Sequence, residues 1–307
     1  MSLQGKVAII TGSGRGLGLA YAKELARQGA AVVINDVDPV VADAAVEELT
    51  AAGARAVAVV APVGPTSTAD ELLRVALEEF GRVDILVANA GVLRDKTLWK
   101  MSDEDFDTVV DIHLRGTFTT VRAVATYLRS VGSPGRIIAI GSPTGQRGNF
   151  GQSNYAAAKA GIVGMVRTWA LELKKSEITV NAVIPVAATA MTATMPYFAA
   201  AVAADAAGEP MPAFFRKDLG FGTADDVAGL IGYLASDDAA SITGQAIGIG
   251  GDRIQLWSHP TPVVTAYHEG GWTTEALLNE FPAVIEGSLQ SVGETLPPLP
   301  EDLQPQG

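Results

Sequence analysis

The chain has no cysteine and only three histidines among its 307 residues. The absence of cysteine excludes a disulfide framework, a thiolate metal site and a cysteine nucleophile. The three histidines, His113, His259 and His268, are far apart in the sequence and form no His-x-x-x-His pair. Zinc chemistry usually needs clustered ligands of this kind, so we expect no metal site.

Long apolar segments and an excess of positive charge are also missing. No segment reaches the ~18 uninterrupted apolar residues of a membrane helix, and the N-terminal residues do not have the basic start and apolar stretch of a signal peptide. The chain has 22 Lys and Arg against 34 Asp and Glu, a formal net charge of −12, which disfavours binding to phosphate backbones. We therefore expect a cytoplasmic protein with no membrane or nucleic-acid partner.

Hydrophobic residues make up 48% of the chain, enough for a large buried core. Up to about residue 250, short and almost wholly apolar segments alternate with longer helical ones. Apolar strands without polar alternation are typical of a parallel sheet covered on both faces, and the alternation indicates βαβ units. The expected strands are 7–10, 31–34, 56–60, 85–87, 136–140, 179–184 and 246–249, and the expected helices are 17–28, 39–52, 68–80, 103–129, 152–174 and 224–235.

The pattern predicts one α/β domain over residues 1–252, followed by a C-terminal extension over 253–307 whose last residues are disordered. Within the domain, residues 187–222 (the flap segment) are rich in Ala, Met, Phe and Pro, and include Met191, Met195, Phe198, Phe214 and Phe215. This composition fits a mobile helical flap over an apolar ligand, and equally a helical hairpin that covers core. The aromatic residues between Trp257 and Phe281 are expected to pack on their own domain or on a neighbouring subunit.

A glycine-rich turn, Thr11-Gly12-Ser13-Gly14-Arg15-Gly16-Leu17-Gly18, joins the first expected strand to the first helix. Glycine lets a backbone approach a pyrophosphate, and the start of the next helix offers free N–H groups. The second strand ends at Asp36, 36 − 18 = 18 residues after Gly18, close to the spacing of an acid that binds an adenosine ribose. A carboxylate there repels a 2′-phosphate, so we expect NAD. Arg15 favours NADP, which remains the alternative.

Three side chains near the fifth expected strand form a second pattern. Tyr155 and Lys159 are four residues apart at the start of a helix, so both project from one face. Ser142 lies 155 − 142 = 13 residues before Tyr155, at the end of the adjoining strand. A nearby ammonium and an oxidised nicotinamide favour the phenolate and lower a tyrosine pKa. The serine hydroxyl can hydrogen-bond the substrate oxygen. The set predicts acid–base chemistry by a tyrosine.

With these motifs the chain resembles the short-chain dehydrogenases/reductases from about Gly5 to Gly251. The matching motifs are Thr11-Gly12-x-x-x-Gly16-x-Gly18, Asn89-Ala90-Gly91, the Ser142/Tyr155/Lys159 set and Asn181-Ala182-Val183-Ile184-Pro185. The resemblance implies a Rossmann-type doubly wound sheet of seven parallel strands, and a homodimer or homotetramer.

The same resemblance implies the roles of individual residues. Tyr155 would act as general acid/base, Lys159 would bind the nicotinamide ribose, and Ser142 would contact the substrate. Asn89 would support the central strand and the cofactor. The implied cofactor contacts are Gly12, Ser13, Arg15, Gly16, Leu17, Gly18, Asp36, Val63, Asn89, Ala90, Gly91, Tyr155, Lys159, Pro185 and Thr189.

Several positions depart from the family's pattern. His113 stands where the family usually has a catalytic asparagine, and is carried here as a fourth catalytic candidate. Pro62 replaces the usual aspartate beside adenine, which leaves that contact to the N–H of Val63 and to apolar groups. Val186 follows Pro185 in place of the usual glycine, and is expected to shift the nicotinamide pocket. The extension beyond Asp252 also exceeds the common length.

Residues 113–118, Arg94-Asp95 and residues 148–152 are similar to a narrower subgroup. It includes the (3R)-hydroxyacyl-CoA dehydrogenase domain of peroxisomal multifunctional enzyme type 2, also a 17β-hydroxysteroid dehydrogenase. The similarity implies NAD and a bulky apolar secondary alcohol or ketone from lipid or steroid metabolism, either a 3-hydroxyacyl thioester or a steroid. Two alternatives stay open: an NADP-dependent ketoreductase of the same family, and a cofactor-binding subunit that has lost catalysis.

Overall fold

An eight-stranded sheet lies at the centre of the computed structural model, which describes residues 3–188 and 195–304. The strands lie in the order β3-β2-β1-β4-β5-β6-β7-β8. Their bounds are β1 Val7–Ile10, β2 Ala31–Asp36, β3 Ala56–Val60, β4 Ile85–Ala88, β5 Gly135–Ile140, β6 Ile178–Pro185, β7 Ala246–Gly250 and β8 Arg253–Trp257. All neighbouring pairs are parallel except β7 and β8, which are antiparallel. The predicted α/β class and parallel sheet are confirmed, and β8 is an addition to the seven expected strands.

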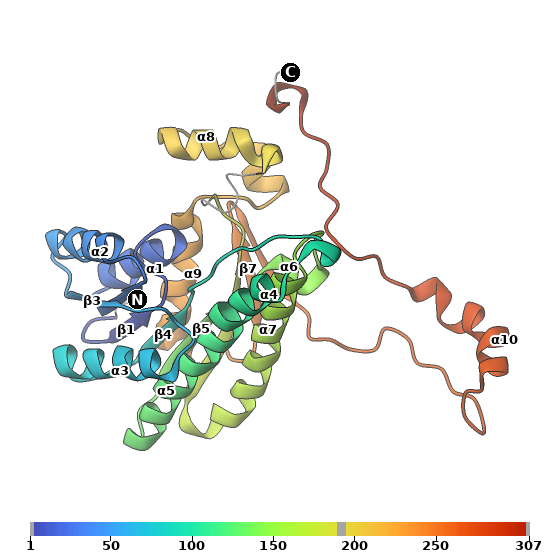
Figure 1. The fold of residues 1–307 in the computed structure, drawn as a ribbon, viewed down its shortest axis with the longest axis horizontal. Coiled ribbons are helices and arrows are strands. Elements are labelled where there is room, and N and C mark those ends of the chain that lie inside the picture. Colours follow the sequence, from blue (N-terminus) through green and yellow to red (C-terminus); the bar gives the residue numbers. More distant parts are fainter. Residues whose placement is uncertain (1–2, 189–194, 305–307) are drawn as a thin grey trace.

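Helices cover both faces of the sheet (Figure 1). One face carries α1 (Gly16–Arg27), α2 (Pro39–Ala51) and α9 (Ala224–Ala235), and the other carries α3 (Thr66–Phe80), α5 (Gly116–Val131) and α7 (Ser153–Leu173). The apolar strands supply both cores, because successive side chains point to opposite faces. In β1, Ala8 and Ile10 enter the first core, and Val7 and Ile9 enter the second.

The expected long helix over 103–129 is interrupted in its first half. It begins as α4 (Asp103–Val109), passes through a π-helical turn at Val110–Arg115 and continues as α5. A capping box is present at its start, where the Ser102 hydroxyl accepts a hydrogen bond from the Asp105 N–H at 3.1 Å. Such π-turns are frequent at functional sites, and this one contains His113.

The flap segment leaves and rejoins the body at one point, where Ala187 forms a parallel bridge with Gly222. It contains a 3-10 turn (Pro196–Phe198), α8 (Ala199–Ala207) and a π-turn (Phe214–Asp218). Phe198 stacks on Phe221 with ring centroids 4.3 Å apart, and both belong to a small buried cluster with Phe215. These phenylalanines therefore form a core of their own. Met191 lies outside the described residues.

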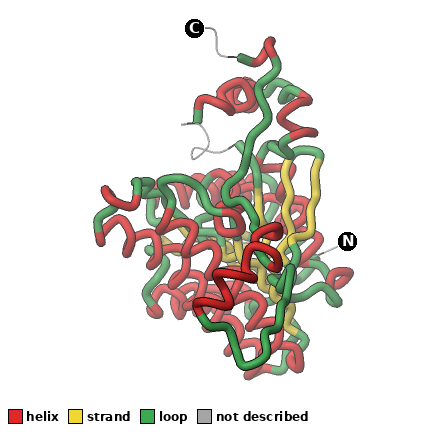
Figure 2. Tube along the Cα trace, turned by 90° about the vertical axis from the view of Figure 1, so that its right-hand side faces the viewer, coloured by secondary structure: helices red, strands yellow, loops and turns green. Residues whose placement is uncertain are grey.

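The C-terminal extension begins with β8 and then leaves the body (Figures 1 and 2). Its elements are α10 (Thr274–Val284) and two 3-10 turns, Glu286–Ser288 and Glu301–Leu303. The last part returns toward the flap segment, where Leu296, Leu299 and Leu303 pack against the phenylalanine cluster. The domain boundary at residue 252 stays a prediction, although the sheet continues through Trp257.

In the described part of the chain, no helix combines the length and the apolar character needed to cross a lipid bilayer.

Candidate active site

The glycine-rich turn lies between β1 and α1, at the carboxyl end of the sheet. Gly12 has a φ of +62°, and a Cβ there would lie 2.7 Å from the Cα of Ala90. A Cβ on Gly18 would lie 2.1 Å from the carbonyl oxygen of Gly12. Both positions therefore need glycine so that the turn can close on itself and on the loop after β4.

Side-chain hydrogen bonds join the turn to the loop after β4. The Nδ2 of Asn89 donates to the carbonyl oxygens of Thr11 and Gly12 at 3.0 and 2.8 Å. In return, the hydroxyl of Thr11 accepts from the N–H groups of Asn89 and Ala90 at 3.0 and 3.1 Å. This clamp fixes the two loops that border the predicted cofactor site.

The end of β2 lies beside the same turn. The Asp36 side chain is close enough to Gly14 that a Cβ there would lie 2.8 Å from its Oδ2. Ser13 is buried, and its hydroxyl donates to the carbonyl oxygen of Ile10 and accepts from the N–H of Asn35. The N–H of Ser13 also donates to the carbonyl oxygen of Asn35 at 2.8 Å, so this buried residue holds the turn against β2 with both its side chain and its backbone.

The turn fits a dinucleotide pyrophosphate. The first residues of α1 offer backbone N–H groups with no side-chain cap at the helix start, where Arg15 is exposed. The space above Gly16 is open, since a Cβ there meets nothing within 4 Å. Free N–H groups at a helix start with room above them are what a phosphate needs. The structure therefore brings Gly12, Arg15, Gly16, Leu17 and Gly18 together with Asp36 at one end of the sheet.

Ser142, Tyr155 and Lys159 converge at the end of β5. Ser142 caps the short helix α6 (Pro143–Arg147), and its side chain lies close enough to the Tyr155 phenol to lower the pKa of that phenol. The Nζ of Lys159 lies 5.6 Å from the centroid of the Tyr155 ring. It donates a 2.6 Å hydrogen bond to the carbonyl oxygen of Ile140, the last residue of β5. The strand end and one helical face thus place the three side chains in contact, as their spacing predicts.

Burial shifts the pKa values of this set. Lys159 is 3% exposed, and desolvation lowers its pKa to about 7. Burial also raises the pKa of Tyr155, and the nearby Ser142 side chain offsets only part of that rise. In the cofactor-free protein the phenol is therefore a weaker acid than free tyrosine. The lysine alone does not produce the expected phenolate, so a further positive charge is required.

His113 is buried against the same tyrosine. The two rings meet edge to face with centroids 5.1 Å apart. The Nε2 of His113 lies 2.8 Å from the carbonyl oxygen and 3.0 Å from the nitrogen of Val92, so either neutral tautomer makes one of these bonds. Burial, with the nearby Lys159 charge, lowers the His113 pKa to about 3. The histidine is therefore neutral at physiological pH, and its Nδ1 is buried without a hydrogen-bond partner in the described structure.

Asn154 is a site residue that the sequence motifs do not single out. It is fully buried, and its Nδ2 donates to the carbonyl oxygens of Arg94 and Asp105 at 3.1 and 2.9 Å. Its Oδ1 accepts from the N–H of Tyr155 at 2.8 Å. Asn154 thus ties the start of α7 to the loop after β4 and to α4 itself. The sequence signal that could have identified Asn154 is its position, since it is a polar residue directly before the tyrosine at the start of a helix.

The remaining predicted site residues surround this set. Val63 is buried against α5, next to an exposed Pro62, and Pro185 ends β6. Val186 is hydrogen-bonded to Ile249 and Gly222, which fixes its backbone. Thr189 lies outside the described residues.

A cavity of about 260 Å³ adjoins the site. It lies between α6, the ends of β6 and β7, β8 and the tail, and its lining includes Pro143, Arg147, Ile184, Val186, Trp257 and Leu296.

Comparisons with known proteins agree with this geometry. The family model described as short chain dehydrogenase matches residues 6–197. A 3-oxoacyl-[acyl-carrier-protein] reductase from Synechocystis sp. is 41% identical over 258 residues, covering 83% of this chain and 99% of that protein. The hydroxyacyl-CoA dehydrogenase ChsB1 of Mycobacterium tuberculosis is 41% identical over 270 residues, covering 84% and 81% of the two chains.

Two further matches bear on the subgroup and the fold. The mouse peroxisomal multifunctional enzyme type 2 is 40% identical over 204 residues, covering 64% of this chain and 27% of that one, which confirms the predicted subgroup resemblance. The crystal structure of a short chain dehydrogenase from Mycobacterium avium superposes with a TM-score of 0.80 at 31% identity. It covers 95% of this chain and 98% of that chain.

The buried lysine makes a prediction about stability. Its pKa is about 7 in the folded protein and near 10.5 when exposed, so between these values the unfolded chain binds one more proton and stability rises with pH. We expect Lys159→Met to stabilise the cofactor-free protein by roughly 2–4 kcal/mol at pH 7, with a smaller gain at pH 9.5. Urea unfolding at both pH values measures this, with the exposed Lys100→Met as control. An equal gain at the two pH values would contradict the assignment.

Proposed function

This chain belongs to the short-chain dehydrogenase family, and from that premise we propose that it is an NAD-dependent oxidoreductase that interconverts a 3-hydroxyacyl thioester and its ketone. The observation that carries the proposal is the contact of Ser142, Tyr155 and Lys159 at the end of β5, beside the glycine-rich turn. Membership of the family makes the protein an oxidoreductase that uses NAD or NADP. The choice of cofactor, the substrate and the residue roles below are our proposals.

Tyr155 is the proposed general acid/base. In the oxidation direction the phenolate oxygen of Tyr155 takes the proton of the substrate hydroxyl. Ser142 hydrogen-bonds the oxygen of that substrate hydroxyl and orients it. When bound, the nicotinamide dinucleotide supplies the acceptor of the hydride that leaves the carbinol carbon. Lys159 would bind the ribose hydroxyls and favour the phenolate. The raised pKa of Tyr155 without cofactor supports a site that becomes competent only when the oxidised dinucleotide adds its positive charge.

His113 is proposed as a positioning residue for this tyrosine. Its ring occupies the space above Gly91, where a Cβ would lie 2.2 Å from the Cε1 of His113. It bonds to Val92 on one side and packs against Tyr155 on the other. A histidine that stays neutral down to about pH 3 cannot exchange protons in the working range, so we assign it orientation and not proton transfer.

The proposed cofactor is NAD, because Asp36 ends β2 next to the turn and its carboxylate would repel a 2′-phosphate. The exposed Arg15 is the feature that favours the alternative, NADP. Apart from these two side chains, the proposed site fits NAD and NADP equally, because the turn and the start of α1 would contact the pyrophosphate that both dinucleotides share.

The substrate proposal follows from the two acyl-thioester relatives and the adjoining cavity. Arg147 and Trp257 line that cavity, and Arg94 and Lys96 are exposed nearby on the loop after β4, where they suit the phosphates of an acyl-CoA. A hydroxysteroid is the second candidate, because part of the lining is apolar. The intact set of Ser142, Tyr155 and Lys159 argues against a catalytically silent subunit. A cytoplasmic location and a homodimer or homotetramer complete the proposal.

Removing the phenol oxygen should remove turnover. We expect Tyr155→Phe to lower kcat about 10²–10⁴-fold, the usual contribution of a general acid/base, with dinucleotide binding retained. NADH formation from a 3-hydroxyacyl-CoA measures the first effect, and NADH fluorescence titration measures the second. Tyr127→Phe is the matched control on α5 and should leave both unchanged. Turnover within twofold of the unaltered protein would refute the role of Tyr155.

Cofactor choice should respond to the carboxylate after β2. We expect Asp36→Ala to raise the ratio of kcat/KM for NADP over that for NAD at least tenfold, about 1.4 kcal/mol, because the repulsion of the 2′-phosphate is lost. Steady-state assays with both dinucleotides give the ratio, and Asp43→Ala on the exposed face of α2 is the control. If the ratio does not move, the ribose is not bound at Asp36.

The pH dependence of kcat distinguishes a positioning role of His113 from a proton-transfer role. We expect His113→Ala to lower kcat about tenfold at every pH between 6 and 9, with little change in the KM for NAD, because Tyr155 loses its orientation. His113→Gln, which can keep a hydrogen bond to Val92, should recover most of the loss. A change in the shape of the pH profile would show instead that His113 titrates during turnover.

A further inference from the structure

Residues 259–292 form a segment that we call the arm. It leaves the body at His259, whose Nδ1 accepts a hydrogen bond from Arg167 at 3.2 Å, and returns where the N–H of Gly293 donates to the carbonyl oxygen of Arg147 at 2.8 Å. Figure 1 shows the arm projecting away from the sheet and its helices, with α10 near its tip, and in Figure 2 the arm lies in front of the body. Within the described structure, the hydrogen bonds and ion pairs of residues 260–292 join arm residues only to one another.

The arm has little to stabilise it by itself. Its one α-helix, α10, has 11 residues and contains Pro282, whereas isolated helices shorter than about 12–15 residues are marginal in water. His268 pairs with Glu280 at 3.0 Å and its ring lies 5.2 Å from that of Trp272, which closes the tip internally. A segment that extends this far while depending on so few contacts needs a surface to pack against.

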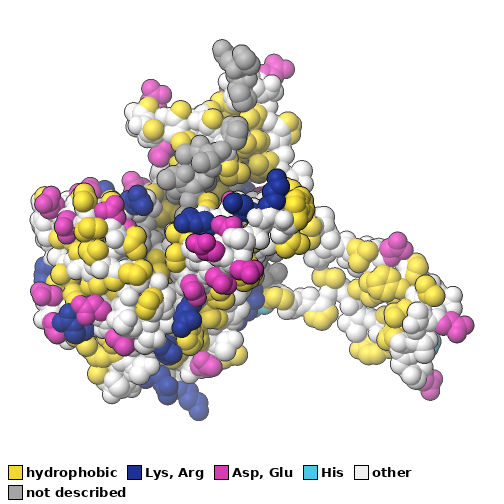
Figure 3. Space-filling model, in the orientation of Figure 1, with side chains coloured by type: hydrophobic (Ala, Val, Ile, Leu, Met, Phe, Trp, Pro, Cys, Tyr) yellow, Lys and Arg dark blue, Asp and Glu magenta, His cyan; other side chains and the backbone are white. Residues whose placement is uncertain are grey.

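Apolar side chains cover the arm. Leu278 is 75% exposed on α10, and Leu277 and Phe281 are also exposed there. Val263, Tyr267, Leu289 and Val292 are exposed on the two legs. Figure 3 shows the arm as a separate lobe with extensive apolar surface. Exposed apolar surface of this extent marks an interaction site in a soluble protein.

The arm is also acidic. Its charged residues other than histidine are Glu269, Glu275, Glu280 and Glu286, and no lysine or arginine follows Arg253 in the sequence. A complementary surface must therefore combine apolar side chains with lysine or arginine.

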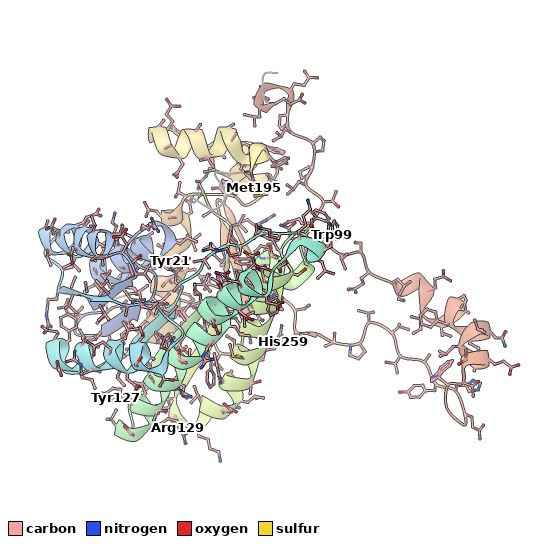
Figure 4. All side chains as sticks on the ribbon, viewed as in Figure 1. Tyr21, Trp99, Tyr127, Arg129, Met195 and His259 are labelled. Atoms are coloured by element: carbon pink, nitrogen blue, oxygen red, sulfur yellow. The ribbon has the colours of Figure 1, made fainter. Side chains whose placement is uncertain are left out.

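The body offers such a surface beside the active site, which we call the mouth patch: Leu98, Trp99 and Phe150. All three side chains are more than 70% exposed, and the rings of Trp99 and Phe150 are 6.4 Å apart. Arg94, Lys96 and Lys100 are exposed around it, interspersed with the exposed acidic residues Asp95, Asp103 and Glu104. Lys96 is paired with Asp105 at 3.9 Å. Figure 4 places Trp99 on the side of the body from which the arm projects. The patch flanks the loop and the helix that Asn154 ties to Tyr155.

We propose that the arm of one copy packs on the mouth patch of a second copy, and that the second copy's arm packs on the first. At ~3.3 Å per residue, the leg before α10 (residues 259–273) reaches up to about 50 Å and the leg after it (residues 285–292) up to about 26 Å, against a radius of gyration of about 19 Å for a chain of this size. The arm is thus long enough to reach onto the surface of a neighbour. A two-fold exchange packs the apolar arm on the apolar patch at both ends and brings the arm's glutamates to Arg94 and Lys100, so each active-site mouth is bordered by residues of two chains.

The absence of native cysteine allows a direct test by cross-linking. Leu278→Cys and Trp99→Cys are placed in separate copies of the full-length protein, which are co-expressed and treated with a short bis-maleimide. We expect a two-chain product of 2 × 31.7 = 63.4 kDa that contains both variants. It should form at least tenfold more than from Leu278→Cys paired with Val131→Cys, an exposed apolar position at the end of α5.

A second variant carries both substitutions in one chain and is co-expressed with cysteine-free protein. A cross-link within that single chain would show that the arm folds back on its own mouth patch, and would overturn the proposal. The proposal would also be overturned if the mixed Leu278→Cys and Trp99→Cys sample gave no more two-chain product than the Leu278→Cys and Val131→Cys control. The readout does not depend on turnover, so failure here would leave the proposed oxidoreductase activity untouched, and the reverse also holds.

Discussion

The hydrogen bond from Lys159 to the carbonyl oxygen of Ile140 connects the parts of this site. It joins α7 to the end of β5, and so holds the helix that carries Tyr155 against the strand that ends before Ser142. Burial removes the Lys159 side chain from water, and this desolvation lowers its pKa because it disfavours the charged ammonium form. Under the role that we propose for Lys159, the fold accepts this cost in order to hold the ammonium group beside Tyr155.

The same constraint explains why neighbouring residues are small or polar. Gly91 has no Cβ because the His113 ring occupies that space. Asn154 satisfies one loop carbonyl group, one carbonyl group of α4 and the tyrosine N–H with one amide side chain. The clamp between Asn89 and Thr11 extends this network to the glycine-rich turn. The loops at the carboxyl end of the sheet are therefore fixed before any ligand arrives, which reduces the entropy lost on binding.

Much of the fold was predictable because buried parallel strands have a distinctive sequence: all seven expected strands exist, and the helix over 224–235 has the expected bounds. The site was predictable where its residues are close in sequence, as Tyr155 and Lys159 are. The π-turn at residues 110–115 was not, because a π-turn and an α-helix share similar apolar spacing. The eighth strand, which is not among the expected ones, has a weak sequence signal in the alternation of Ile254 and Leu256 with polar residues after a glycine turn.

Contacts between distant segments could not be read from local patterns. The direction in which His113 points, and its neutral state, depend on packing against Val92 and Tyr155. The phenylalanine cluster of the flap segment closes only because the tail brings Leu296 and Leu299 back to it.

That last contact joins two segments that are about 100 residues apart. The hydroxyl of Tyr197 in the flap segment donates to the carbonyl oxygen of Pro297 at 2.7 Å, beside the apolar contacts of the tail leucines. The flap segment therefore cannot separate from the tail without breaking this hydrogen bond and exposing the apolar cluster to water, so we expect the two segments to unfold as one cooperative unit.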